Sequence, residues 1–261
     1  MIFYWKDEYR EDRIVLSVTG PAVRYGFGFF ETLYWDGART ARLEMHLARL
    51  FGSLMAFGLA FQEEDFEEVI SQVAHKNGLT GRTARINIQY PVDEPGAVRA
   101  IVTVAPYSPP SRALSLALSP RPLHFWLGLH KSTNHLTYHL EHQGALASGL
   151  DGTVLATPCG HLLEAAHAAL LFSDGDRFLT PSPPGQGPEA PGLLPSTALA
   201  AASEALSITA RPIRVDEING FQQAWALNSL LGMQPLAAIG QWEFSPDAET
   251  ATRVTAIIHN A

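Results

Sequence analysis

The stretch HFWLGLHKSTNHLTYHLEH, residues 124–142, places one lysine in a segment that is otherwise free of Asp, Glu and Arg up to Leu140. Among Asp, Glu, Lys and Arg, Lys131 is the only residue between Pro122 and Leu140. The whole chain has three lysines in 261 residues. Partial removal from water lowers the pKa of a lysine, and a neutral amine is a nucleophile that forms Schiff bases with aldehydes. A lysine can also lay its stem along apolar surface and keep its head in water. Both interpretations of Lys131 stay open at this point.

The sequence on either side of Lys131 alternates between strand and helix patterns. A helix is expected at 132–149, with Ser132 or Thr133 as its N-cap. The remaining patterns of this half predict strands at 113–123 and 153–158, a hairpin over 161–181, a long irregular connection at 181–192 and a helix at 196–208. The patterns before residue 107 predict strands around a turn at Asp36-Gly37 within 25–43, helices at 44–59 and 63–78, and a hairpin whose turn is 93–96.

This order of elements predicts an α/β fold (α+β) whose strands are mostly antiparallel hairpins in the first half. The proline-rich stretch PYSPPSR, residues 106–112, is the best candidate for a domain boundary. We therefore expect a small N-terminal α/β domain at 1–108 and a larger C-terminal domain at 109–261.

Composition excludes several classes of protein. The net charge of -8 and the pI near 5.6 argue against a general nucleic-acid binder. No run of 18 apolar residues marks a membrane span, and the charged start MIFYWKDEYREDR does not resemble a signal peptide. The single Cys159 permits no internal disulfide and no thiolate cluster. We expect a soluble, cytoplasmic protein with a small-molecule substrate, without nucleic-acid or membrane partners.

Two further features favour the interpretation of Lys131 as a nucleophile that forms a Schiff base. Glu164 lies in the apolar run HLLEAAHAALLF, where a carboxylate is costly unless a positive or hydrogen-bonding group meets it. Ser196 and Thr197 lie at the first turn of a predicted helix, where amide N–H groups favour an anion. A Schiff-base lysine, a carboxylate and a phosphate cradle are what pyridoxal phosphate needs.

Several segments, in this order along the chain, resemble those of the class IV (fold-type IV) pyridoxal-phosphate enzymes. That family includes aminodeoxychorismate lyases, D-amino-acid transaminases and branched-chain aminotransferases. The segments are YGFGFFETLYWDG (25–37), RLEMHLARL (42–50), GLHKSTNHL (128–136), LLE, LLF and LTP (162–181), GLLPSTALA (192–200) and WALNSLLGMQPL (225–236).

The resemblance implies a two-domain fold with the cofactor in the cleft, a homodimer, and a set of site residues. Lys131 would be the Schiff-base lysine and proton shuttle, and Glu164 would bond the pyridine nitrogen. His46 is expected to be structural. Arg49 would contact the phosphate, with the cradle completed by Ser196, Thr197, Asn228 and Ser229, and Leu194 would pack on the ring. The candidate substrate contacts are Tyr25, Phe30, Tyr90 and His167.

The subgroup is indicated by the form of the lysine segment. The short pattern K-x-x-N-x-L, with Leu136 in the last place, resembles the lyases and D-amino-acid enzymes rather than the branched-chain enzymes. The Arg-x-His carboxylate trap of the D-amino-acid enzymes is missing at 89–94, as is the arginine-bearing glycine-rich stretch of the lyases. We expect an aminodeoxychorismate lyase that releases p-aminobenzoate and pyruvate in folate synthesis. The alternative is a class IV aminotransferase acting on D- or branched-chain amino acids.

Two alternatives from other classes remain. His135, His139 and His142 share one helix face and could bind a metal, but no HExxH pattern supports this, so we predict no metal. The second alternative is a non-catalytic binding module that keeps the fold, because 165–169 and 196–199 depart from the family pattern. The presence of both Lys131 and Glu164 argues against such a module.

Overall fold

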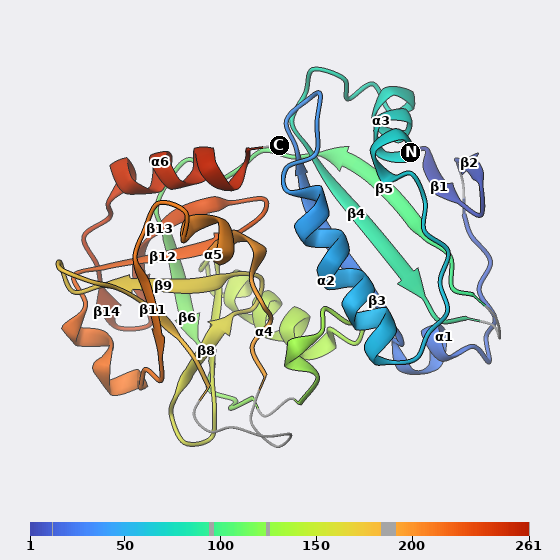
Figure 1. Ribbon diagram of the computed structural model, residues 1–261. Coiled ribbons are helices and arrows are strands. Elements are labelled where there is room, and N and C mark those ends of the chain that lie inside the picture. Colours follow the sequence, from blue (N-terminus) through green and yellow to red (C-terminus); the bar gives the residue numbers. More distant parts are fainter. Residues whose placement is uncertain (12, 94–96, 124–125, 184–191, 261) are drawn as a thin grey trace. The chain divides into compact units, whose positions relative to one another are not determined.

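The computed structural model describes the chain except residues 12, 94–96, 124–125, 184–191 and 261 (Figure 1). The chain divides into two compact units. The first unit is Met1–Pro109 with His130–His135 and His259–Ala261, and the second is Pro110–Leu129 with Leu136–Ile258. This division differs from the two continuous domains expected at 1–108 and 109–261, because the segment around Lys131 groups with the first unit.

The first unit is built on an antiparallel sheet in the order β2-β1-β5-β4-β3. Its longest pairing joins β3 to β4 in unbroken register from Gly28↔Pro91 to Trp35↔Ala84. The elements are β1 (Phe3–Trp5), β2 (Glu8–Arg10), α1 (Pro21–Tyr25), β3 (Gly28–Trp35), α2 (Leu43–Ala56), α3 (Phe66–Lys76), β4 (Ala84–Pro91) and β5 (Ile101–Pro106). Strands β3, β4 and β5 and helices α2 and α3 confirm predicted elements of this half. The strand expected after the Asp36-Gly37 turn is reduced to an isolated bridge between Trp35 and Thr40, and most of the predicted 93–96 turn lies outside the described residues.

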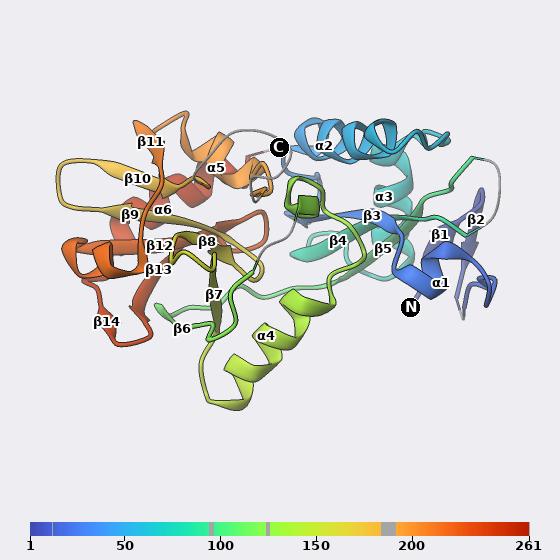
Figure 2. The same cartoon turned by 90° about the horizontal axis from the view of Figure 1, so that it is seen from below.

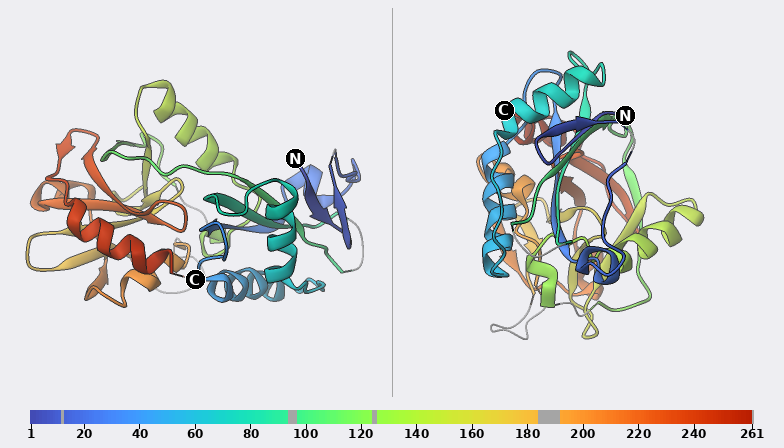
Figure 3. Two further views of the ribbon diagram at one scale, coloured as in Figure 1. Left: turned by 90° about the horizontal axis from the view of Figure 1, so that it is seen from above. Right: turned by 90° about the vertical axis from the view of Figure 1, so that its right-hand side faces the viewer.

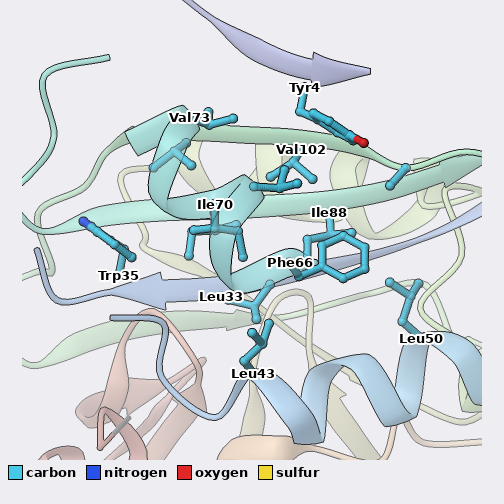
Figure 4. Close-up of a cluster of buried hydrophobic side chains, with 14 of the residues drawn as sticks. Tyr4, Leu33, Trp35, Leu43, Leu50, Phe66, Ile70, Val73, Ile88 and Val102 are labelled. Carbon is cyan, nitrogen blue, oxygen red and sulfur yellow. The ribbon is translucent and has the colours of Figure 1, made fainter. Parts of the chain in front are cut away.

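Helices α2 and α3 cover one face of this sheet and bury the core of the unit (Figure 4). Because side chains alternate along the strand, Leu33 and Trp35 lie in that core, to which Ile70 of α3 also belongs. Asp65 caps α3 by accepting a hydrogen bond from the amide of Glu68, as acidic first turns favour. The same alternation leaves Phe30, Thr32 and Tyr34 on the opposite face of the sheet.

The second unit is built on a mixed sheet in the order β11-β10-β9-β12-β13-β6-β7-β8, with β14 paired to β13. Its strand β6 runs parallel to both β13 and β7. Helix α4 lies on one side of this sheet and helices α5 and α6 lie on the other (Figures 2 and 3). The elements are β6 (Leu114–Leu118), η1 (Trp126–Leu129), α4 (Leu136–Ala147), β7 (Gly152–Ala156), β8 (Leu162–Ala165), β9 (Ala169–Ser173), β10 (Phe178–Pro181), α5 (Thr197–Ala202), β11 (Ile208–Arg211), η2 (Val215–Gly220), β12 (Gln223–Asn228), β13 (Gly232–Ile239), β14 (Trp242–Glu243) and α6 (Ala248–Ile258).

The two helices predicted in the second half of the chain are shorter in the structure. The helix expected at 132–149 begins at Leu136, because the backbone before it pairs with β3. Ser132 and Thr133 are therefore not its N-cap. The helix expected at 196–208 ends at Ala202, since residues 208–211 form a strand that pairs with β10. The predicted irregular connection at 181–192 falls mostly outside the described residues.

No helix in the part of the chain that the structure describes is long and apolar enough to cross a membrane.

Candidate active site

Lys131 is held by its backbone against the beginning of strand β3. Its carbonyl oxygen accepts a hydrogen bond from the amide of Phe30 at 2.9 Å, and Ser132 forms an isolated bridge with Phe29. The amide of Thr133 donates a hydrogen bond to the carbonyl oxygen of Gly28 at 2.9 Å. The hydroxyl Oγ1 of the same residue donates to the carbonyl oxygen of Gly26 at 2.6 Å. The lysine is therefore fixed by sheet-like pairing rather than by a helix.

Two glycines of the YGFG motif make this docking possible. Gly26 has φ 62°, and a Cβ there would lie 3.2 Å from Cα of Asn134. A Cβ on Gly28 would lie 2.7 Å from the carbonyl oxygen of Tyr90 and 3.1 Å from Oγ1 of Thr133. Larger residues at either position would push the lysine segment away from the strand.

The side chain of Lys131 lies over an aromatic ring. Its Nζ is 4.6 Å from the ring centroid of Phe30, and the lysine is half-buried. His135 packs edge-on against the same ring, with centroids 5.7 Å apart. A cation over a ring face is stabilised by the quadrupole of the ring. Phe30, predicted as a substrate contact, is thus a direct neighbour of the lysine amine.

His130, which precedes the lysine, anchors the segment to helix α2. Its Nδ1 lies 3.1 Å from Oγ of Ser53, and its ring packs edge-on against Phe29 and Phe57. Burial lowers the pKa of His130, which favours the neutral imidazole. We did not predict this anchor, because Ser53 lies far away in the sequence.

A buried cluster of charged side chains joins β3 to α2 next to this segment. Glu31 is fully buried; its Oε1 accepts from Nε of Arg49 at 2.7 Å, and its Oε2 lies 2.6 Å from Nη2 of the same arginine. Nδ1 of His46 lies 2.7 Å from Oε2. Burial opposes the ionisation of Glu31, but the bonds from His46 and Arg49 and the charge of Arg49 lower its pKa to about 2.

This cluster bears on two predictions from the sequence. The buried contact of His46 fits the structural role expected of it. Arg49 places two of its nitrogens on Glu31, and a guanidinium has five N–H donors in all, so a phosphate contact stays a prediction. Sequence analysis missed Glu31, although a lone carboxylate among alternating apolar residues of a strand is a usable signal.

The other substrate candidates of the first unit lie in different surroundings. Tyr90 is fully buried among Phe51 and Phe61, and its hydroxyl donates to the carbonyl of Gln62 at 2.6 Å. We therefore correct its assignment: Tyr90 belongs to the core and cannot reach a substrate without unpacking. Tyr25 is 61% exposed at the end of α1, beneath the guanidinium of Arg24.

In the second unit, Glu164 lies in strand β8 and is half-buried. Its Oε1 accepts a hydrogen bond from the hydroxyl of Tyr138 at 3.0 Å. Burial raises the pKa of Tyr138, and the negative charge of Glu164 raises it further, so the phenol stays protonated and acts as a donor. Tyr138 is therefore one hydrogen-bonding partner of the kind that the apolar run around Glu164 requires, and sequence analysis did not identify it.

The predicted cradle residues also lie in the second unit. Oγ1 of Thr197 lies 3.3 Å from Oγ of Ser229, so residues 32 apart in the sequence bring two hydroxyls together. Ser196 caps α5, its Oγ accepting from the amide of Leu199 at 3.2 Å. Leu194 is half-buried in the segment before this helix.

Asn228 links two turns of this unit. Its Nδ2 donates to the carbonyl of His167 at 2.8 Å, and its Oδ1 accepts from the amides of Leu230 and Leu231. The side chain of Asn228 thus holds the turn that contains Ser229. His167 lies exposed in the turn between β8 and β9, with its ring 4.5 Å from that of His142.

Of the three histidines considered as a metal site, His135 lies before the first residue of α4. His135 groups with the first unit and packs on Phe30, whereas His142 belongs to the second unit and packs on His167. Among the residues that the structure describes, no group of three or more His, Cys, Asp or Glu side chains is placed to hold a metal ion.

The functional groups present fit the needs of pyridoxal phosphate. The first unit offers the amine of Lys131 on an aromatic ring, and the second offers the carboxylate of Glu164, oriented by a phenol. The paired hydroxyls of Thr197 and Ser229 are donors suited to a phosphate. An amine, an ionisable carboxylate and a hydroxyl cradle are the groups that this cofactor requires.

Solved structures share this fold. A branched-chain aminotransferase from Thermoproteus uzoniensis, solved with norvaline, has 18% identity and a TM-score of 0.84 over 99% of this chain and 94% of its own. A hypothetical aminotransferase from Mycobacterium tuberculosis in its PLP-bound form has 22% identity and a TM-score of 0.82 over 99% of both chains. A Legionella pneumophila protein provisionally assigned as a 4-amino-4-deoxychorismate lyase has 19% identity and a TM-score of 0.78 over 93% of both chains.

No curated protein matches the chain. The sequence profile of amino-transferase class IV matches residues 28–239, which is most of the chain and includes Lys131 and Glu164. This match confirms the resemblance found in the sequence, and the solved structures confirm the predicted fold class. The chain belongs to the amino-transferase class IV family, whose enzymes depend on pyridoxal phosphate.

Proposed function

We propose that the protein is a lyase that converts 4-amino-4-deoxychorismate to p-aminobenzoate and pyruvate, a step of folate synthesis. The observation that carries the enzymatic role is the amine of Lys131, held by β3 and placed over the ring of Phe30. The lyase subgroup is supported by the short lysine segment, in which Leu136 begins α4. The likeness in fold to the Legionella protein is in keeping with it.

We propose that the site residues implied by the family resemblance serve one cofactor. Lys131 would bind its aldehyde carbon, Glu164 would accept a hydrogen bond from its ring nitrogen, and Thr197, Ser229 and Arg49 would hold its phosphate. Bound pyridoxal phosphate supplies an aldehyde that reacts with amines and a ring that accepts electrons from the substrate carbon.

The protein's own residues then move the proton. The amine of Lys131 would take the proton from the amine-bearing carbon of the substrate. The bond between the neighbouring ring carbon and the enolpyruvyl oxygen would then break as the ring becomes aromatic, and Lys131 would return the proton to the departing group, which leaves as pyruvate. Phe30 keeps the lysine amine on the sheet face where the substrate arrives.

Polar side chains beside Phe30 are proposed to contact the substrate. Gln89 is the register partner of Phe30, and Oγ1 of Thr32 donates to Oδ1 of Asn87 at 2.9 Å on the same face. The bond to Thr32 directs the amide NH2 of Asn87 away from that hydroxyl, as a donor for an oxygen of the substrate. Neutral donors of this kind would replace the arginine clamps that the sequence lacks at 89–94.

A second candidate function is amino transfer to a keto acid. It is favoured by the likeness in fold to the Thermoproteus and Mycobacterium aminotransferases, which covers 99% of this chain. Both functions need Lys131 and Glu164 in the same roles. They differ in whether the amino group leaves with the product or stays on the cofactor.

The first experiment is reconstitution of the purified protein with pyridoxal phosphate, followed by borohydride reduction and peptide mapping. The expected result is a visible absorption band and a stable label on Lys131. Assays for p-aminobenzoate release and for amino transfer from D- and branched-chain amino acids then separate the two functions. Label-free Lys131 in folded protein would refute both and leave the binding-module alternative.

We further propose a homodimer, as the family resemblance implies. Sedimentation equilibrium of the reconstituted protein would show twice the mass of the 28.4 kDa chain. A monomer with full activity would refute this assignment.

A further inference from the structure

We infer that Tyr138 is a positioning residue that fixes the orientation of Glu164 and keeps the shared proton on the ring nitrogen of the cofactor. This inference deepens the proposed function and rests on it, because it concerns the partner of a carboxylate assigned there. Neither the family resemblance nor the sequence patterns pointed to Tyr138.

The contact itself is direct. The hydroxyl of Tyr138 lies 3.0 Å from Oε1 of Glu164, within the range of a good hydrogen bond. A carboxylate has two oxygens and about four lone-pair positions, so accepting this bond leaves capacity for a donor on the cofactor. The phenol thus occupies one acceptor position of the carboxylate.

The ring of Tyr138 is rigidly placed. Only 5% of the residue is exposed, and it packs in a small apolar cluster with Leu155, Leu163 and Ala166. Two of these neighbours flank Glu164 closely in the sequence. Tyr138 is the third residue of α4, so the same contacts join the helix to strands β7 and β8.

The chemical consequence follows from proton affinity. A hydrogen bond donated to a carboxylate stabilises its charged form and makes it a weaker base. A weaker base next to a pyridine nitrogen leaves the proton on the nitrogen, where it strengthens the electron-accepting ring. Because burial and the charge of Glu164 raise the pKa of Tyr138, the phenol remains a donor over the working pH range.

The test uses pyridoxal phosphate labelled with nitrogen-15 in its ring and bound to the full-length protein. We compare wild type with Tyr138→Phe, which removes the hydroxyl and keeps the ring in its apolar cluster. The nitrogen-15 shift should move toward that of an unprotonated ring, and cofactor affinity should fall by roughly ten-fold, as expected for a lost bond to a charged group. A merely structural tyrosine would leave the nitrogen-15 shift unchanged.

Two further variants make the result specific. Tyr90→Phe is the matched control, since Tyr90 is also buried but donates to a backbone carbonyl, and this variant should leave the nitrogen-15 shift of the ring unchanged. Incorporation of a fluorinated tyrosine at 138, a stronger donor, should move the shift opposite to Tyr138→Phe. This variant keeps the experiment decisive even if the phenylalanine variant does not fold.

The outcomes separate this inference from the proposed function. If Glu164→Gln moves the ring-nitrogen shift and neither change at Tyr138 does, the inference is overturned and the role of Glu164 stands. If wild type binds no labelled cofactor, or if Glu164→Gln has no effect on the nitrogen-15 shift, the proposed function of the site is refuted, and the inference about Tyr138 is refuted with it.

Discussion

Replacing Glu31 by glutamine tests the buried charge cluster beside the lysine segment. The variant keeps the shape of the side chain but leaves the guanidinium of Arg49, which is 12% exposed, without its counter-charge. Breaking a buried ion pair from one side costs about 3–5 kcal/mol of unfolding free energy. The lowered pKa of Glu31 gives the net effect of burial and of its partners His46 and Arg49 on the charged carboxylate.

The pKa of Glu31 falls from its ordinary value of 4.5 to about 2, despite the opposing effect of burial. At about 1.4 kcal/mol for each pKa unit, this shift corresponds to about 3 kcal/mol of stability. A carboxyl group whose pKa is lowered on folding contributes its stability fully above its unfolded pKa. The contribution is then lost as pH falls from 4.5 through about 2.

The assay is urea unfolding followed by circular dichroism, with amide hydrogen exchange of β3 and α2 as the local readout. We expect Glu31→Gln to lower the free energy of unfolding by about 3 kcal/mol at pH 7. The difference in unfolding free energy between the variant and wild type should become smaller as the pH approaches 2. The control is Glu8→Gln, which breaks an exposed pair with Arg10 and should change little. A difference below about 1 kcal/mol at pH 7, or one independent of pH, would refute the reasoning.

Three further changes test other parts of the structure. Ile70→Ala, at a fully buried position of α3, should lower the unfolding free energy by about 2–5 kcal/mol in urea titrations; a smaller loss would mean that the core collapses around the gap. Thr197→Val removes the hydroxyl that meets Ser229 and should weaken cofactor binding roughly ten-fold in fluorescence titrations, while Thr209→Val on an exposed strand position should not. Asn228→Ala removes the link between the turns at His167 and Ser229 and should speed amide exchange at Leu230 and Leu231, whereas Asn228→Asp keeps the acceptor for both amides and should protect them.

The sequence predicted the longer elements of the first unit, β3, α2, α3, β4 and β5, because each has a local signal, whereas the short β1, β2 and α1 were not predicted. Strand alternation is set by neighbours along the chain, and the part of the 25–43 pattern before the Asp36-Gly37 turn does form strand β3. The same alternation could have corrected the assignment of Tyr90. It lies in phase with Ile86 and Ile88, whose side chains all enter the core.

The partners of the site residues could not be predicted in the same way. Tyr138 meets Glu164 across 26 residues, and His130 meets Ser53 across 77, so no periodic pattern links them. The helix expected from Ser132 was wrong at its start for a related reason. Its first residues have helix-capping side chains, but the long-range pairing with β3 overrides that local preference.

The docking of residues 130–133 on β3 also has a consequence for assembly of the protein. Strand β3 is the last strand of its sheet, and an open edge of this kind is a template for pairing with another chain. The lysine segment covers the beginning of that edge by bonding the amide of Phe30 and the carbonyl of Gly28. A fragment ending at Pro109 would lack this cover and would tend to self-associate. The segment that carries Lys131 thus also protects the protein against aggregation. It is synthesised only after residues 1–109, which form most of the first unit.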